Sequence, residues 1–185
     1  MAKYTRDSVV FRDNSEIPSD IYTVKFTSFI KKQSSTDRPM IEASCSIVSP
    51  ETVQVGDKTI MVQGRSFKMY NLLDPVETYG LGQLVDGLTR GGLNPTEVFE
   101  LPEDEIWPED DNNKVLAKMV NKTCNMRLFS EQSFMMTKPT QEERRRGIKP
   151  TQQLGPDGSP IKIGFAIKGD FSNITGPADQ DGAPY

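Results

Sequence analysis

The sequence predicts a mainly β fold, a small curved barrel of five strands with one helix between the third and the fourth strand. Several stretches alternate apolar and polar residues with the period of two that is typical of half-buried strands. A clear helix start, Asp74-Pro75-Val76-Glu77, follows the third of these stretches. At 185 residues, of which 35% are hydrophobic, the chain is long enough for one domain with a core.

The first two strands are predicted over Asp20 to Lys32 and over Met40 to Val48, after a polar N-terminal arm of residues 1–19. In the second strand, Glu42 and two serines alternate with an apolar face. The residues expected on the inward faces are Tyr22, Val24, Phe26, Ile30, Ile41, Ala43, Cys45 and Ile47. Those expected on the outer face of the first strand are Lys25, Thr27, Phe29 and Lys31.

The third strand is predicted to be long and bent. A hairpin over residues 53–62 comes first, because Gly56-Asp57 supplies the backbone angles of a tight turn. Gly64 then interrupts the strand pattern, as a glycine does at a bulge or a sharp bend. After the bend, Phe67 and Met69 are expected inward, which turns Lys68 and Tyr70 outward.

The predicted helix runs from Asp74 to Arg90 and stops at Gly91-Gly92. A short helix from Asn94, an acidic loop and a brief helix over Asn112 to Asn121 follow. The fourth strand covers Thr123 to Phe129, with Arg127 and Phe129 outward.

A flexible basic loop is predicted over residues 132–160, because this segment has little apolar pattern and is rich in proline. The last strand spans Ile161 to Lys168, with Lys162 and Lys168 outward and with Ile161, Ile163, Phe165 and Ile167 inward. Residues 20–170 thus form the folded domain. Residues 171–185 are rich in Gly, Pro and Asp, so they are expected to form a disordered acidic tail.

The charge of the chain is unevenly distributed. The formal net charge is −4, from 22 Lys and Arg against 26 Asp and Glu. Ten of the acids lie in residues 100–111 and in the last seventeen residues, and without them 22 cations face 16 acids. A basic face beside segregated acidic segments is therefore expected, and the net charge by itself does not argue against a polyanionic partner.

The absence of histidine removes most catalytic schemes, including Ser-His-Asp and Cys-His nucleophiles and histidine-containing metal sites. Cys45 and Cys124 lie in strand-like runs and are expected to be buried reduced thiols, which favours a reducing cytoplasm. No signal peptide or membrane span is recognised. We expect no enzyme, no metal and no cofactor.

The outer faces of several predicted strands combine cations with aromatic rings, as a sheet that binds single-stranded nucleic acid does. Rings stack on bases and cations hold phosphates. A run of three arginines in the flexible loop is well placed to close over a phosphate backbone. The candidate binding residues are Lys25, Phe29, Lys31, Lys68, Tyr70, Arg127, Phe129, Arg144, Arg145, Arg146, Lys162 and Lys168.

Four segments together resemble the single-stranded DNA-binding proteins of phages, which are small OB-fold replication and recombination proteins. The segments are "IEASCSIVSP" from Ile41, "GRSFKMYNLL" ending at Leu73, the following "YGLGQLVDGLTRGGL", and "NKTCNMRLF", within residues 20–170. The order of three strands, a helix and two strands is also that of an OB barrel. The resemblance implies binding of single strands without sequence choice, and an acidic terminal segment that competes for the binding surface or recruits replication proteins.

Two functions stay open at this point. In the first, the chain is a non-catalytic protein of the host cytoplasm that coats single-stranded DNA during phage replication or recombination, as a monomer or a homo-oligomer. In the second, it is a structural or adaptor protein of a virion or a replisome that uses an OB-like barrel to hold another protein. Neither needs a membrane.

Overall fold

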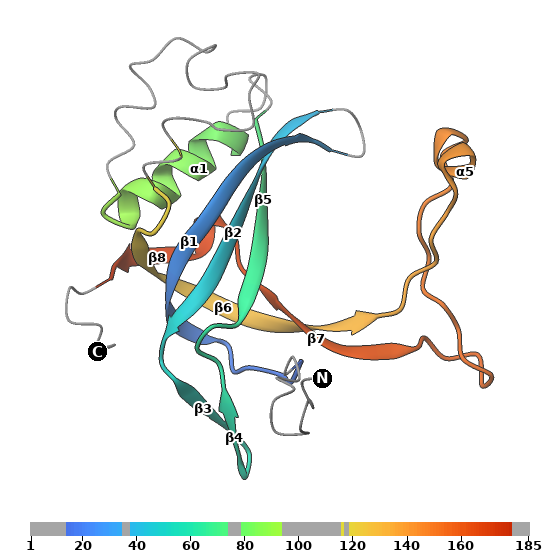
Figure 1. Ribbon diagram of the computed structural model, residues 1–185, viewed down its shortest axis with the longest axis horizontal. Coiled ribbons are helices and arrows are strands. Elements are labelled where there is room, and N and C mark those ends of the chain that lie inside the picture. Colours follow the sequence, from blue (N-terminus) through green and yellow to red (C-terminus); the bar gives the residue numbers. More distant parts are fainter. Residues whose placement is uncertain (1–13, 35–37, 74–78, 94–115, 117–118, 179–185) are drawn as a thin grey trace, which may run out of the picture. The chain divides into compact units, whose positions relative to one another are not determined.

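The computed structural model of the chain describes residues 14–34, 38–73, 79–93, 116 and 119–178 (Figure 1). Two compact units are present. The larger unit consists of Ile17–Glu131 and Ile167–Tyr185, and the smaller unit consists of Met1–Glu16 and Gln132–Ala166. The predicted short helix from Asn94, the acidic loop of residues 100–111, the N-cap at Asp74 and the last seven residues lie outside the described residues.

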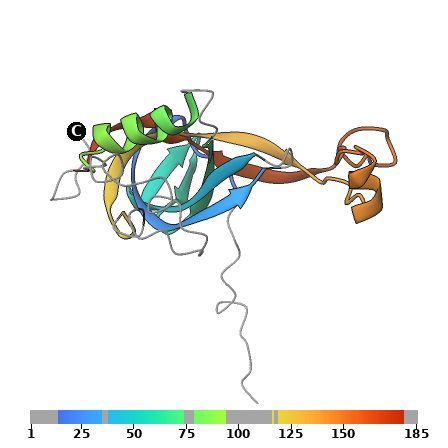
Figure 2. The same ribbon diagram turned by 90° about the horizontal axis from the view of Figure 1, so that it is seen from above.

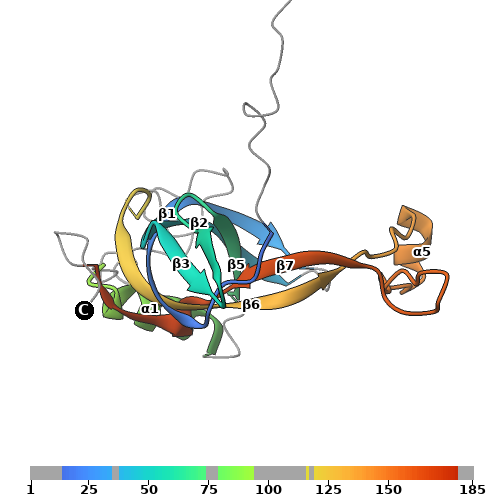
Figure 3. The ribbon, with the colours of Figure 1, turned by 90° about the horizontal axis from the view of Figure 1, so that it is seen from below.

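The fold is mainly β, as predicted. A six-stranded antiparallel sheet has the order β5-β2-β1-β6-β7, and β8 also pairs with β6. The strands of the larger unit curl around a shared interior (Figures 2 and 3), but among the described residues they do not close into a barrel. The strands are β1 (Asp20–Gln33), β2 (Pro39–Ser49), β5 (Ser66–Leu72), β6 (Thr123–Phe134), β7 (Lys162–Lys168) and β8 (Ile174–Pro177).

A β-bulge in β1 overturns part of the predicted strand pattern. The pairing of β1 with β2 shifts register between Phe26 and Ser28, and the Thr27 hydroxyl donates a hydrogen bond to the Ser44 carbonyl at 3.0 Å. The extra residue reverses the alternation beyond it. Phe29 therefore turns inward and is 7% exposed, with its ring centroid 5.1 Å from that of Phe26. Ile30, predicted inward, is on the opposite face.

The alternation of β2 and β5 is as predicted. Ile41, Ala43, Cys45 and Ile47 are buried, and so are Phe67 and Met69. The two strands pair directly, with Ser44 opposite Lys68 and Glu42 opposite Tyr70. Directly paired residues share a face of the sheet, so the burial of one face places these four side chains on the other.

The predicted hairpin forms between β3 (Thr52–Val55) and β4 (Lys58–Met61) as a separate two-stranded sheet. Its turn uses Gly56 at a φ of +59°, in the left-handed region that favours glycine. Gly64 has a φ of +79° where the chain turns into β5, which agrees with the predicted bend. Figure 1 shows the hairpin beyond one end of β2.

The helix α1 (Tyr79–Arg90) ends as predicted, and Gly92 after it has a φ of +70°. Leu84, Val85 and Leu88 are buried along one face. The helix packs closely on a short 3-10 helix, η2 (Phe171–Asn173). A Cβ atom built on Gly87 would lie 2.3 Å from the Phe171 carbonyl oxygen, so this contact requires a glycine.

Residues 171–178 are part of the folded core, contrary to the prediction that the tail begins at residue 171. Phe171 and Ile174 are fully buried, and the Phe171 ring lies 6.4 Å from that of Phe26. The Asp170 carboxylate accepts a hydrogen bond from the Ser172 amide at 2.8 Å and starts η2. Two well-spaced apolar side chains thus fix a segment whose overall composition is that of a tail.

The smaller unit contains more secondary structure than the predicted loop over residues 132–160. Strand β6 continues to Phe134, and a short helix, α5 (Gln141–Arg145), contains Arg144 and Arg145. The segments on either side of α5 pair, since the Gln153 amide donates to the Met135 carbonyl and the Thr137 amide to the Thr151 carbonyl, each at 2.8 Å. Backbone hydrogen bonds hold this segment together. Such bonds do not depend on an alternation of apolar side chains, so the sequence pattern did not predict them.

Candidate nucleic-acid interface

The candidate site is the face of β1, β2 and β5 that points away from the core, which we call the outer face. Strand pairing defines this face. On β5 and β2, Lys68 stands opposite Ser44, and Tyr70 stands opposite Glu42. On β2 and β1, Ser44 stands opposite Ser28, Glu42 opposite Ile30, and Met40 opposite Lys32. All of these residues belong to the larger unit. They form one surface that is built on regular strands.

Tyr70 and Lys68 lie on this face as predicted. The Tyr70 side chain is 54% exposed, although neighbouring positions of β5 are buried. Lys68 extends from two residues earlier in β5, and its Nζ lies 2.6 Å from Oε1 of Glu42. A ring and an ammonium group therefore lie side by side on a rigid strand, where a base and a phosphate of one nucleotide could be held.

Glu42 and Lys32 are residues of the candidate site that the sequence pattern did not indicate. The Glu42 carboxylate is 3% exposed, and its second oxygen, Oε2, accepts a hydrogen bond from Nζ of Lys32 at 2.6 Å. These hydrogen bonds from Lys32 and Lys68 lower the pKa of Glu42 below its ordinary value, against the opposing effect of burial. The carboxylate is thus ionised and joins two strands through their lysines.

The adjacent lysines Lys31 and Lys32 are the feature of the sequence that indicates a cation on the outer face at this point of β1. Adjacent strand residues point to opposite faces, so one of the two lysines must face outward in either register. Because of the bulge at Thr27, the lysine that faces outward is Lys32. Lys31 stands opposite the buried Ile41 and shares the face of Phe29. The prediction that Phe29 and Lys31 lie on the outer face is therefore wrong.

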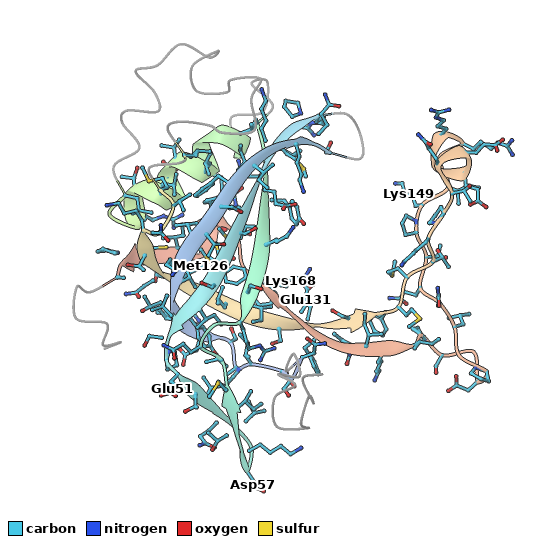
Figure 4. All side chains as sticks on the ribbon, in the orientation of Figure 1. Glu51, Asp57, Met126, Glu131, Lys149 and Lys168 are labelled. Atoms are coloured by element: carbon cyan, nitrogen blue, oxygen red, sulfur yellow. The ribbon has the colours of Figure 1, made fainter. Side chains whose placement is uncertain are left out.

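Arg127 and Lys25 extend the outer face toward β6. Arg127 is exposed and stands opposite Ile21, whose side chain is 38% exposed. Lys25 is half-buried and stands opposite Ser46 of β2 on one side and Thr123 of β6 on the other. The Phe129 ring, predicted to stack on bases, is half-buried. Lys168 is exposed, with its Nζ 3.6 Å from Oε2 of Glu131 on the neighbouring strand (Figure 4).

The remaining predicted cations belong to the smaller unit. Lys162, Arg145 and Arg146 are exposed, and Arg146 forms an ion pair with Glu142 at 2.5 Å. Arg144 lies within α5. Arg145 belongs to α5, Arg146 follows this helix directly, and Lys162 begins β7.

The described residues give no support to an alternative metal or nucleophile site. No group of three or more His, Cys, Asp or Glu residues among them is placed to hold a metal ion. Cys45 and Cys124 are fully buried, as predicted, and burial raises the pKa of the Cys124 thiol to about 12, which leaves it protonated and unreactive. In this part of the chain, no helix has the length and hydropathy that a membrane crossing requires.

Comparison with protein-family models and with curated proteins finds no match for this chain.

Proposed function

We propose that this chain is a non-catalytic protein that binds single-stranded DNA with little sequence preference and coats it during phage DNA replication or recombination in the host cytoplasm. The observation that carries the proposal is the outer face, where the exposed Tyr70 ring stands opposite Glu42, the residue whose carboxylate holds the ammonium groups of Lys68 and Lys32. Stacking on a ring tolerates every base, and ammonium groups bind the backbone that all sequences share.

We infer further that the curled sheet is a variant of the OB fold. In the main sheet, strands β1, β2 and β5 precede α1, and β6 and β7 follow it, which matches the element order of an OB barrel once the β3–β4 hairpin between β2 and β5 is set aside as an insertion. OB folds bind oligonucleotides on the face of their second and third strands, with help from the loop between the last two. Here those strands are β2 and β5, which carry Glu42, Lys68 and Tyr70, and the connection from β6 to β7 carries Arg144, Arg145 and Arg146.

The position of the charges supports a single strand over a duplex. Tyr70 and Lys68 are two residues apart on the same face of β5, so a ring and a cation are presented together on a sheet. A ring 54% exposed on a strand gives a base a stacking surface only if that base is unpaired. We therefore expect duplex DNA to compete poorly.

Fluorescence anisotropy with labelled oligo-dT and with its duplex, measured over a range of salt concentrations, tests the proposal. The affinity for oligo-dT should fall by about 0.7 log units per log unit of salt for each phosphate neutralised. A site of roughly 4–16 nucleotides is expected. Absence of binding at low salt to oligo-dT of this length would reject the proposal.

A specific observation favours the second function, an adaptor that binds another protein. Among the residues of 132–166 whose burial the structure describes, only Pro139 is buried, although the backbone is regularly hydrogen-bonded. Five large apolar side chains of this segment are exposed, and exposed apolar side chains that gather into one patch mark protein-interaction sites. They are Met135, Met136, Ile148, Leu154 and Ile163.

Self-association is the form of the adaptor function that this chain allows to be tested directly. Sedimentation of the purified protein over a range of concentrations should show a concentration-dependent assembly that Leu154→Ser weakens, because Leu154 is the most exposed of these side chains at 62%. Lys149→Ser, on the same unit, is the matched control. A monomer at all concentrations would leave this function without support.

A further inference from the structure

The Glu42 carboxylate occupies an unusual position for an acid on a surface proposed to bind DNA. It lies at the centre of the outer face, directly between Ile30 of β1 and Tyr70 of β5. Its side chain is only 3% exposed, whereas the Lys32 and Lys68 side chains that cover it are 41% and 53% exposed. The acid is therefore beneath the two cations, and the cations are what a ligand would meet.

The hydrogen bonds fix both lysines without using up their capacity to bind. Each oxygen of Glu42 accepts one hydrogen bond, of 2.6 Å, from a different lysine. An ammonium group has three N–H donors, so each lysine keeps donors for another anion. Two long side chains that would otherwise sample many rotamers are held about one carboxylate.

The same arrangement lowers the positive charge of the surface. Two ammonium groups and one carboxylate leave a single net positive charge, although the sequence places two lysines here. A phosphate that approaches Lys32 and Lys68 is attracted by both and repelled by Glu42. The carboxylate also competes with the phosphate, because both are oxygen acceptors for the same donors.

We propose that Glu42 is a built-in competing anion that limits the affinity of the outer face for a phosphate backbone and reduces the salt dependence of binding. This inference rests on the proposed function, because it concerns the same surface. With the full screening of bulk water, the repulsion between unit charges about 4 Å apart corresponds to about fivefold in affinity, which is the lower limit for this site. Removal of the Glu42 charge should therefore tighten binding of oligo-dT by about fivefold at low salt.

The opposite result would follow if the chief effect of Glu42 were to position the lysines. A substitution would then release two flexible side chains, and binding would weaken. The sign of the change separates the two effects. Glu42→Gln is the suitable substitution, because an amide oxygen can still accept a hydrogen bond from one lysine and the side chain keeps its size.

The experiment measures anisotropy of labelled oligo-dT with wild type, Glu42→Gln and Glu51→Gln over a range of salt concentrations. Glu51 is exposed next to the β3–β4 hairpin (Figure 4), so Glu51→Gln makes the same change in net charge away from the outer face. Glu42→Gln should tighten binding about fivefold at low salt and steepen the salt dependence by about one phosphate. Glu51→Gln should have little effect.

A triple variant, Glu42→Gln with Lys32→Ala and Lys68→Ala, shows whether the gain acts through the lysines. It should not bind more tightly than the double variant Lys32→Ala with Lys68→Ala. A chemical-denaturation curve for every variant confirms that folded proteins are compared.

Each outcome supports or overturns the inference. Equal or weaker binding by folded Glu42→Gln, or an equal gain in Glu51→Gln, overturns it while the proposed function stands. Failure of both wild type and Glu42→Gln to bind oligo-dT overturns the proposed function and this inference together. Binding by Glu42→Gln where wild type does not bind would support the inference and show that the intact surface is too weak for the proposed function.

Discussion

Tyr70 is the residue whose substitution best separates binding from folding. Its ring is 54% exposed on β5, between buried neighbours that hold the strand in place. Tyr70→Ala should cost roughly 1–3 kcal/mol of oligo-dT binding. The free energy of unfolding should change little, because loss of an exposed ring leaves no cavity.

Phe29→Ala is the contrasting variant, since Phe29 is 7% exposed and packs on Phe26. It should lose about 3–5 kcal/mol of stability, while the folded fraction binds oligo-dT normally. Chemical denaturation and anisotropy of both variants measure the two effects. If Tyr70→Ala unfolds the protein, or if it leaves binding intact, Tyr70 is not a stacking residue.

Glu42 also gives the stability of the protein a specific pH dependence. The hydrogen bonds from Lys32 and Lys68 lower the pKa of this carboxyl from its ordinary value of 4.5. A lowered folded-state pKa contributes stability that is fully present above the unfolded-state value and is lost as pH falls through the folded-state value. The wild-type midpoint of denaturation should therefore fall more steeply below pH 4.5 than that of Glu42→Gln.

Urea denaturation of both proteins between neutral and acidic pH measures this difference. Other carboxyls contribute equally to both curves, so the difference between the curves isolates Glu42. Parallel curves throughout would show that the carboxyl is not stabilised by its two lysines.

At the scale of elements, the contact between α1 and η2 depends on one of the glycines of the helix. Glycine usually weakens a helix interior, which makes Gly82 and Gly87 unexpected in α1. Only Gly87 has a packing reason among the described contacts, because a Cβ atom there would lie 2.3 Å from the Phe171 carbonyl oxygen. At Gly82, a Cβ atom would meet nothing within 4 Å.

Gly87→Ala and Gly82→Ala should therefore change stability in opposite directions. Gly87→Ala should destabilise the protein by about 1–3 kcal/mol, since η2 or α1 must move. Gly82→Ala should stabilise it by up to about 1 kcal/mol through helix propensity. Thermal denaturation compares the two, and a stable Gly87→Ala protein would mean that α1 and η2 are not in close contact.

At the scale of the whole molecule, the described part of the C-terminal segment completes the core. Phe171 and Ile174 are fully buried, and β8 pairs with β6 next to α1 (Figure 1). Deletion of residues 169–185 should therefore cost several kcal/mol, about the sum expected for loss of two large core side chains. Deletion of residues 179–185 removes none of these contacts and is the control.

Circular dichroism and chemical denaturation of the two truncated proteins test this prediction. A stable protein without residues 169–185 would show that the segment is a dispensable tail. The two deletions also differ in binding measurements. Deletion of residues 169–185 removes acidic charge and core side chains together, so a change in its DNA affinity cannot be assigned to the charge alone.

The sequence by itself determined the mainly β class, the faces of β2 and β5, the β3–β4 hairpin and the end of α1. Each depends on local information: the period of two in a strand, or a glycine that a turn requires. The burial of Cys45 and Cys124 followed from the same alternation.

Only the tertiary structure decided which residues past Thr27 face outward, because a single inserted residue inverts a strand and leaves no trace in its composition. It also brought Lys32, Glu42 and Lys68 together from three strands, since sheet register is set by distant pairings. Phe171 and Ile174 joined the core for the same reason: their burial depends on α1 and β6, which lie far away in the sequence.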